Sequence, residues 1–199
     1  SAADIETADR VTKHIFQWGT YEPAEYGPEI DWEWDPRGDI EWVAAVYRFY
    51  WTTPLVTAYA ATRDERYADV FVELTGDWIR KHPLEKRDRV HPVYKHWRGF
   101  PWLDIQTGIR AGRLCNAFPI MVHGRAFTPE FLAVFLASLY DHQVKTERLP
   151  MNAVHNKAVF EQRGFVDVAA LFPEFKDARR WMALDDAVAD GQPQPAAPL

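Results

Sequence analysis

Cysteine is nearly absent from this sequence, which contains Cys115 alone among 199 residues. One thiol cannot form a disulfide within the chain or a cysteine-based zinc site, and its apolar helical surroundings predict a place in the core. Apolar runs of about 20 residues, the length of a membrane helix, are also lacking, so we expect no membrane insertion. No signal-peptide pattern remains at the start, although Ser1-Ala2-Ala3 is compatible with a processed, exported protein.

Positive charge is in short supply, with 23 Lys and Arg residues against 29 Asp and Glu residues and a net charge of −6. This balance argues against a general polyanion-binding surface, so we expect no nucleic acid partner. A local basic cleft is still compatible with an acidic protein. His91 and His96 have no third ligand at a diagnostic spacing, and we predict neither a metal site nor a cofactor.

Apolar residues make up 47% of the chain, which is enough to build a core. Their spacing is helical in most segments, and no segment shows convincing strand alternation. We therefore predict an all-α fold of about seven helices in antiparallel pairs. The helical domain is expected over residues 1–190, followed by a flexible Pro- and Ala-rich tail at 191–199.

Particular residues predict where helices begin and which faces they bury. Asp39, Asp64 and the pair Thr128-Pro129 are typical of helix starts. A first short helix is expected to carry Ile5, Ala8, Val11, Ile15 and Trp18. A later helix is expected to bury the stripe Ile105, Ile109, Leu114, Phe118 and Met121.

Tryptophans gather in irregular segments. Trp32 and Trp34 flank a carboxylate, and their rings suit either stacking on sugars or plugging the end of a helical array. Trp97 and Trp102 lie in or beside residues 84–101, a segment rich in Arg, Lys and His. Such cations beside aromatic rings suit an anionic saccharide, and the alternative is a solvated charged loop.

The segment 151–181, MNAVHNKAVFEQRGFVDVAALFPEFKDARRW, combines a polar start with a helical apolar stripe. His155-Asn156 opens the predicted helix, where unpaired N–H groups and the helix dipole favour an acidic ligand. From spacing alone, capping and solvent exposure are the favoured interpretation of this pair. Pro173 is expected to end the helix and start the next one. The predicted buried face comprises Val154, Ala158, Phe165, Val168, Ala169 and Phe172.

Two blocks of this sequence resemble the heparinase II/III family of polysaccharide lyases. In that family an Asn near a helix start precedes a Glu, an FPEF-type turn and a Trp, as Asn156, Glu161, Phe172 to Phe175 and Trp181 do here. The N-terminal block matches in order at Asp31-Trp32, Pro36, Glu41-Trp42, Arg48, Trp51, Leu55, Ala58-Tyr59, Thr62, Asp64-Glu65, Tyr67, Phe71, Asp77-Trp78-Ile79 and Pro83. The resemblance covers about Ile30 to Trp181 and implies an incomplete α/α toroid around a sugar-binding cleft.

The resemblance also implies a reaction, β-elimination at a uronic acid. Asn156 matches the residue that neutralises the substrate carboxylate, and His155 is expected to assist it. For the substrate-contacting cation we choose Arg110 over Arg113 and Arg125, with a salt bridge to a neighbouring helix as the alternative. The predicted substrate-binding residues are Arg110, Trp102, Trp97, Trp32, Trp34 and Glu161.

The family's proton-transferring tyrosine and histidine come from a later helix and a β-rich region, beyond the matched blocks. We therefore expect either the N-terminal part of a longer lyase, which would continue into a C-terminal β-domain, or a truncated relative. The enzymatic activity of this chain itself is left undecided. The expected partner is an acidic, uronate-containing polysaccharide such as heparan sulfate, heparin or alginate, and the implied location is secreted or periplasmic.

Two other functions stay open. A glycoside hydrolase on a similar toroid would need an acid and a base or nucleophile carboxylate, for which Asp31, Glu33 and Asp35 are candidates. A non-catalytic glycan-binding or scaffold module would bind sugar without turning it over.

Overall fold

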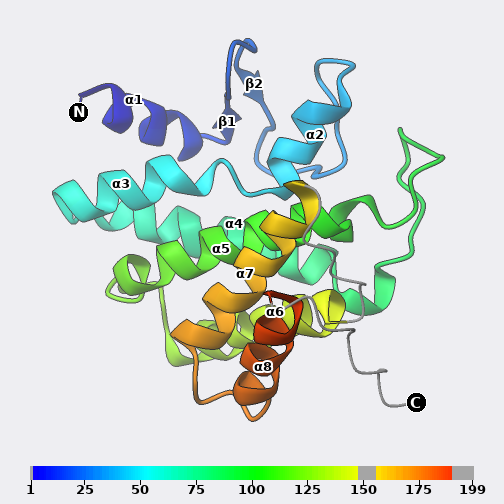
Figure 1. The fold of residues 1–199 in the computed structure, drawn as a ribbon. Coiled ribbons are helices and arrows are strands. Elements are labelled where there is room, and N and C mark those ends of the chain that lie inside the picture. The colour runs from blue at the N-terminus through cyan, green and yellow to red at the C-terminus, as the bar shows by residue number, and fades with distance from the viewer. Residues whose placement is uncertain (1, 148–155, 190–199) are drawn as a thin grey trace.

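The computed structural model describes residues 2–147 and 156–189 of the chain (Figure 1). Its helices are α1 (Ala2–Val11), α2 (Ile40–Tyr47), α3 (Thr52–Thr62), α4 (Glu65–Lys81), α5 (Asp104–Met121), α6 (Pro129–Thr146), α7 (Asn156–Leu171) and α8 (Ala178–Ala189). The other elements are the strands β1 (Ile15–Phe16) and β2 (Ala24–Glu25) and the 3-10 helices η1 (Leu84–Lys86) and η2 (Phe100–Trp102). The predicted all-α class is confirmed, and the tail predicted at 191–199 lies outside the described residues.

The predicted helix starts at Asp39, Asp64 and Thr128 are confirmed. The Asp39 carboxylate accepts a hydrogen bond from the second backbone N–H of α2 at 3.0 Å, and Asp64 does the same for α4 at 3.0 Å. The Thr128 hydroxyl accepts from the Phe131 N–H at 3.3 Å, and Pro129 is the first residue of α6. These side chains satisfy N–H groups that have no partner within the helix.

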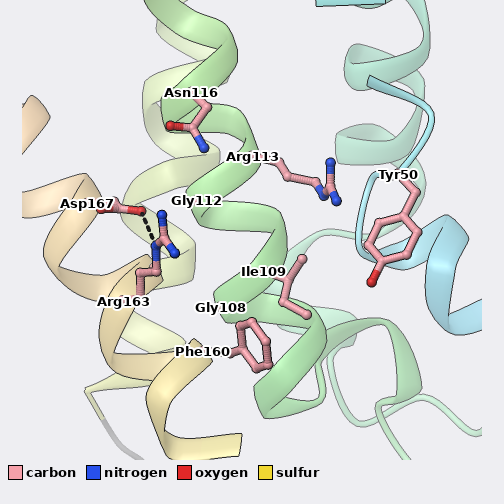
Figure 2. A pocket seen from close by; sticks show the side chains of 10 residues that line it. Tyr50, Gly108, Ile109, Gly112, Arg113, Asn116, Phe160, Arg163 and Asp167 are labelled. Carbon is pink, nitrogen blue, oxygen red and sulfur yellow. Dashed lines mark ion pairs between the residues drawn. The ribbon is translucent and has the colours of Figure 1, made fainter. Parts of the chain in front are cut away.

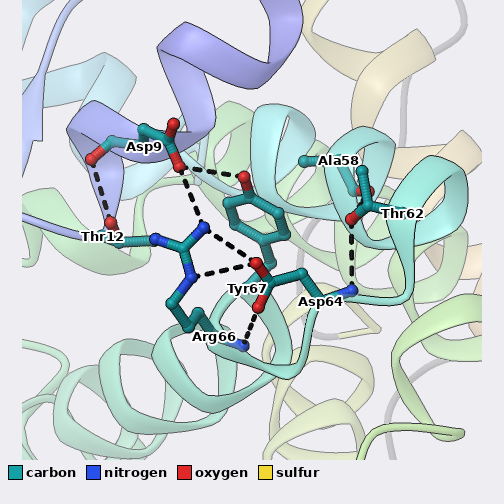
Figure 3. Close-up of polar contacts among 7 residues, drawn as sticks. All are labelled: Asp9, Thr12, Ala58, Thr62, Asp64, Arg66 and Tyr67. Carbon is teal, nitrogen blue, oxygen red and sulfur yellow. Dashed lines mark hydrogen bonds and ion pairs between the residues drawn. The ribbon is translucent and has the colours of Figure 1, made fainter.

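A polar network fastens α1 to the start of α4 (Figure 3). The Tyr67 hydroxyl donates to the Asp9 carboxylate at 2.9 Å, and Arg66 lies 3.7 Å from the same carboxylate. Arg66 also pairs with Asp64 at 2.8 Å. Because α1 in addition packs along α3, the N-terminal helix forms one side of the helical assembly.

The predicted first helix is wrong beyond Val11, where α1 ends. His14 has a φ of 56°, a left-handed conformation that a continuing right-handed helix does not contain. Ile15 and Phe16 then pair antiparallel with Glu25 and Ala24. Strands of two residues are too short to produce a readable alternation of polar and apolar residues, so the sequence gives no sign of them.

The central helix is α5, which contacts α2, α3, α6 and α7. Its predicted apolar stripe is only partly right, because Leu114 and Met121 are buried while Ile109 is half buried. The polar residues Thr107 and Arg110 are fully buried instead. A helix with neighbours on several sides has no single apolar face, so its amphipathic pattern does not identify the inner side.

The predicted buried face of α7 is confirmed at Ala158, Phe165, Val168, Ala169 and Phe172, while Val154 lies outside the described residues. The expectation that Pro173 begins the next helix is wrong. The segment forms turns instead, in which the Phe175 N–H donates to the Phe172 carbonyl at 3.1 Å. The last helix, α8, therefore begins only at Ala178.

The backbones of α5 and α7 touch where two glycines meet. A Cβ atom at Gly108 would lie 2.3 Å from the carbonyl oxygen of Phe160, and a Cβ atom at Gly164 would lie 2.2 Å from that of Gly108. Each distance is far below van der Waals contact, and backbone atoms cannot swing aside as side-chain ends can. The crossing therefore needs glycine for space, since only glycine lacks a Cβ atom.

Gly164→Ala is expected to lower the free energy of unfolding by about 1–3 kcal/mol, because the added methyl overpacks the crossing. Urea unfolding would measure the change. The matched control is Gly112→Ala, whose Cβ atom would meet only the movable Asp167 carboxylate, at 3.2 Å. Alanine favours helix by up to about 1 kcal/mol over glycine, so the control should be neutral or stabilising. Equal stability of the two variants would contradict the crossing.

Candidate functional site

A groove of about 290 Å³ lies between α5 and α7, with Tyr50 from the α2–α3 link at its edge (Figure 2). Its α5 wall uses positions that recur at steps of three and four residues, which fall on one face of a helix. The lining residues are Tyr50, Gly108, Ile109, Gly112, Arg113, Asn116, Phe160, Arg163, Gly164 and Asp167.

The groove carries two guanidinium groups and one carboxylate. Arg163 lies 3.9 Å from Asp167 on the same helix, and burial raises the pKa of Asp167 although Arg163 opposes the rise. The Arg113 guanidinium lies 4.4 Å from the centre of the Tyr50 ring and donates to the Thr53 hydroxyl. Burial lowers the pKa of Arg113. Arginine side chains nevertheless remain cations at neutral pH in proteins.

This set of groups suits an anionic sugar. Arginine binds carboxylate or sulfate through paired hydrogen bonds, and aromatic rings pack on the apolar faces of pyranoses. In the groove, Arg113 and Arg163 could bind the acidic group, and the rings of Tyr50 and Phe160 could pack on the sugar. The Asn116 amide adds an uncharged donor.

The predicted catalytic Asn156 is the first residue of α7. Phe160, Arg163 and Asp167 follow four, seven and eleven residues later and all line the groove. These spacings return to the same side of a helix, so position 156 shares the groove-lining face of α7. The side chain of Asn156 and the whole of His155, its predicted assistant, lie outside the described residues.

Arg110, the predicted substrate-contacting cation, is 0% exposed and belongs to the interior. Its guanidinium donates to the carbonyls of Tyr47 and Pro101 at 2.8 and 2.9 Å and to His142 Nε2 at 2.8 Å. It also lies 4.0 Å from the ring centre of Trp78. No salt bridge forms to it within the described chain, so the alternative drawn from sequence is wrong as well, and a substrate could reach Arg110 only if the core opened.

The histidine beside Arg110 is held neutral. Burial, with a contribution from Arg110, lowers the pKa of His142 well below its ordinary value. Because Nε2 accepts from Arg110, the ring proton belongs on Nδ1, which lies 2.6 Å from the Ser138 carbonyl oxygen. Neutral acceptors thus bind Nε and Nη1 of the buried cation and aromatic rings pack against it, while Nη2 has no hydrogen-bond partner within the described chain.

Arg110→Met is expected to lower the free energy of unfolding by at least about 3 kcal/mol, because two carbonyls and His142 would each lose a buried partner. Chemical denaturation would measure the loss. The matched control is Arg113→Met, three residues along the same helix at the groove, where about 1 kcal/mol or less is expected. A wild-type stability for Arg110→Met would contradict its role in the core.

Three other predicted contact residues are also buried. Trp32 is 1% exposed and its indole N–H donates to Asp77 at 2.8 Å, while that of Trp102 donates to the His82 carbonyl at 3.1 Å. Glu161 is 4% exposed. For Trp32 this position agrees with the packing alternative weighed from the sequence.

Trp34 and Trp97 remain open to solvent, with exposed fractions of 40% and 39%. Trp34 meets the Tyr26 ring edge-on at 4.9 Å, and Trp97 lies 5.7 Å from the Phe100 ring. Neither tryptophan lines the groove. Both rings are available for stacking, but at a place separate from the α5–α7 groove.

Two of the three carboxylates proposed for a glycoside hydrolase, Glu33 and Asp35, bind neighbouring side chains, while Asp31 is exposed. Glu33 pairs with Arg89 at 3.1 Å, and Asp35 accepts from the Tyr94 hydroxyl. The cavity beside Glu33 measures about 10 Å³, close to the volume of one water probe and far too small for a sugar ring. This geometry does not favour a hydrolase site there.

Residues 2–147 and 156–189 contain neither a metal-binding cluster nor a membrane-spanning helix. No group of three or more His, Cys, Asp or Glu side chains in these ranges could hold a metal ion. Nor is any helix there long and apolar enough to cross a membrane. Cys115 is a buried free thiol, as predicted.

Sequence reasoning missed Asn116, Arg163 and Asp167 and ranked Arg113 below Arg110. The signal for α7 was present, because Arg163 and Asp167 recur at helical spacing from Asn156. No equivalent signal existed for α5, where charged residues occupy both the buried and the groove-lining sides.

Comparison with known proteins places this geometry in a family. The family model described as Heparinase II/III N-terminus matches residues 1–189. The chain is 31% identical over 185 residues to a heparin-sulfate lyase of Bacteroides stercoris, covering 87% of this chain and 28% of that protein. It is 33% identical over 180 residues to a heparin-sulfate lyase of Pedobacter heparinus, covering 88% of this chain and 26% of that protein.

Solved structures of lyases have a similar fold. The heparan sulfate lyase HepC from Pedobacter heparinus superposes with a TM-score of 0.84 at 30% identity, covering 96% of this chain and 29% of that one. The predicted incomplete α/α toroid is thereby confirmed. The chain spans less than a third of the length of these relatives. It belongs to the Heparinase II/III N-terminus family.

Proposed function

We propose that this chain forms part of a polysaccharide lyase that cleaves a uronate-containing glycan, such as heparan sulfate, by β-elimination. The observation that carries the proposal is the groove between α5 and α7, which lies on the same face of α7 as position 156. The named activity of the relatives supports it, since both are heparin-sulfate lyases.

The chemistry explains why an asparagine would be useful at position 156. Removing the proton next to a carboxylate is difficult because negative charge accumulates on that carboxylate in the transition state. An amide can donate hydrogen bonds to the developing charge without carrying a charge of its own. His155 would assist in the same role. A separate acid and base must exchange protons with the sugar, and we assign neither to a residue of this chain.

The substrate is proposed to be an acidic polysaccharide rather than a neutral one. The groove brings two arginines and two aromatic rings together in a protein whose net charge is −6. A local cationic groove in an acidic protein selects anions at one place instead of over the whole surface. Trp34 and Trp97 would contact sugars only if a longer chain extended beyond the groove. The expected location is secreted or periplasmic, where such glycans are met.

A second candidate function is a glycan-binding module without turnover. The observation that favours it is the groove lining, whose two arginines and aromatic rings are groups that bind anionic sugars. The two functions share the groove and differ only in whether a bond is cleaved.

Incubation with heparan sulfate, heparin, hyaluronan and alginate separates the two. Ultraviolet absorbance reports the unsaturated uronate product, and calorimetry on the same samples reports binding. Growth of absorbance is the result expected of a lyase. Binding without absorbance supports the module, and the absence of both signals would contradict the two candidates together.

Asn156→Ala, made in a form of the protein that turns over, is expected to reduce kcat by roughly 100- to 1,000-fold with little change in melting temperature, as for a lost charge-stabilising donor. Asn156→Asp has nearly the same size but loses the N–H donors, and should be equally impaired. Gln162→Ala, on the same helix but outside the groove lining, is the control. Near-normal turnover of Asn156→Ala would remove this residue from the mechanism.

A further inference from the structure

Arg113 is a partly buried cation with no anionic partner among the residues that the structure describes. Among the described residues, its side chain donates to the Thr53 hydroxyl and lies over the Tyr50 ring, and neither partner is a carboxylate. Its Nε atom is buried and has no hydrogen-bond partner within the described chain. A charge removed from water without compensation is costly, and a guanidinium in this position attracts an anion from outside the protein.

Arg163, the other cation of the groove, is more exposed than Arg113 and has an anionic partner. The Arg163 side chain is 73% exposed and lies 3.9 Å from the Asp167 carboxylate. Water and Asp167 already compensate its charge, so it gains less from an added anion. Arg113 is therefore the groove cation with most to gain from an anionic ligand.

Arg113 also lies where cavities join. It lines both the α5–α7 groove and a neighbouring cavity of about 170 Å³, whose walls include Thr53 and Thr57. A third cavity of about 200 Å³ shares Thr53 and Thr57 with the second and Tyr50 with the groove. The three cavities thus adjoin one another in a row from α7 to α1, which we call the path, and such a row suits a chain-like ligand better than a compact one.

Charge is distributed unevenly along this path. Within the described residues, Arg113 is the sole Lys or Arg that lines the second cavity, and none lines the third. The walls there include threonines and aromatic rings, among them Thr7, Thr57 and Trp18, and the third cavity is also lined by the acidic residue Asp4. Such a surface suits uncharged, hydroxyl-bearing rings, whereas an anionic group is favoured at Arg113.

We infer that Arg113 binds one anionic group of the polysaccharide, a uronate carboxylate or a sulfate, and so fixes the register of the sugar chain along the path. The planar guanidinium can donate two parallel hydrogen bonds to either group, and stacking on Tyr50 restricts its plane. Partial burial strengthens the pairing relative to an exposed arginine. The inference rests on the proposed function, because it assigns a substrate contact within the same groove.

The test is calorimetric binding of two tetrasaccharides, one unsulfated and uronate-containing and one N-sulfated, to the wild type and to Arg113→Gln. Loss of a charge-assisted contact is expected to weaken binding roughly 10- to 100-fold. Weakening with both ligands identifies the carboxylate as the bound group, and weakening with the N-sulfated ligand alone identifies the sulfate. Either result supports the inference.

The matched control is Arg125→Gln, which removes the same charge from a side chain that is 83% exposed and lines none of the three cavities. It should bind within threefold of the wild type. The salt dependence of binding should also become shallower in Arg113→Gln, a change that a purely structural role would not produce.

If Arg113→Gln does not fold, Arg113→Lys replaces it in the binding test, because lysine keeps the positive charge but lacks the planar guanidinium. It should bind more weakly than Arg125→Gln by at least threefold, and wild-type affinity would overturn the inference. Wild-type affinity in a folded Arg113→Gln would overturn it too while leaving the proposed function intact. Failure of the wild type to bind either tetrasaccharide would instead contradict the proposed function, and the inference with it.

Discussion

The backbone contact between α5 and α7 is the constraint on which the candidate site depends. Gly108 and Gly164 let the two helices touch without an intervening Cβ atom, and this contact fixes the spacing of the groove beside it. Because helices are rigid, fixing one point also fixes the positions of side chains one and two turns away. The glycines thus fix Arg163 and Asp167 on α7 relative to Arg113, which extends from α5 toward Tyr50 (Figure 2).

Two arginines three residues apart on α5, Arg110 and Arg113, have different surroundings. Arg110 is enclosed by carbonyls, a neutral His142 and the Trp78 ring, so its charge organises the core. Arg113, three residues later, points to a different side of α5 and reaches the groove, where its partners are the Thr53 hydroxyl and the Tyr50 ring. Burial lowers the pKa of both groups, but only Arg113 lies where a ligand can approach.

The sequence predicts the fold better than the site, for a physical reason. Helix starts depend on local chemistry, so Asp39 and Asp64 identify them correctly. The apolar residues of α7 recur on one side of the helix, so its buried face can also be predicted. The inner side of α5 depends on neighbours distant in the chain, which no local pattern encodes. Choosing between Arg110 and Arg113 required those neighbours, as did finding that Trp32 is buried while Trp34 is exposed.

The most direct test of the account is a crystal structure of this chain with a heparan sulfate tetrasaccharide. We expect sugar density in the groove between α5 and α7, with an acidic group within hydrogen-bond distance of Arg113 and other rings extending toward Thr57 and α1. Density confined to the exposed loops around Trp34 and Trp97, with an empty groove, would contradict it.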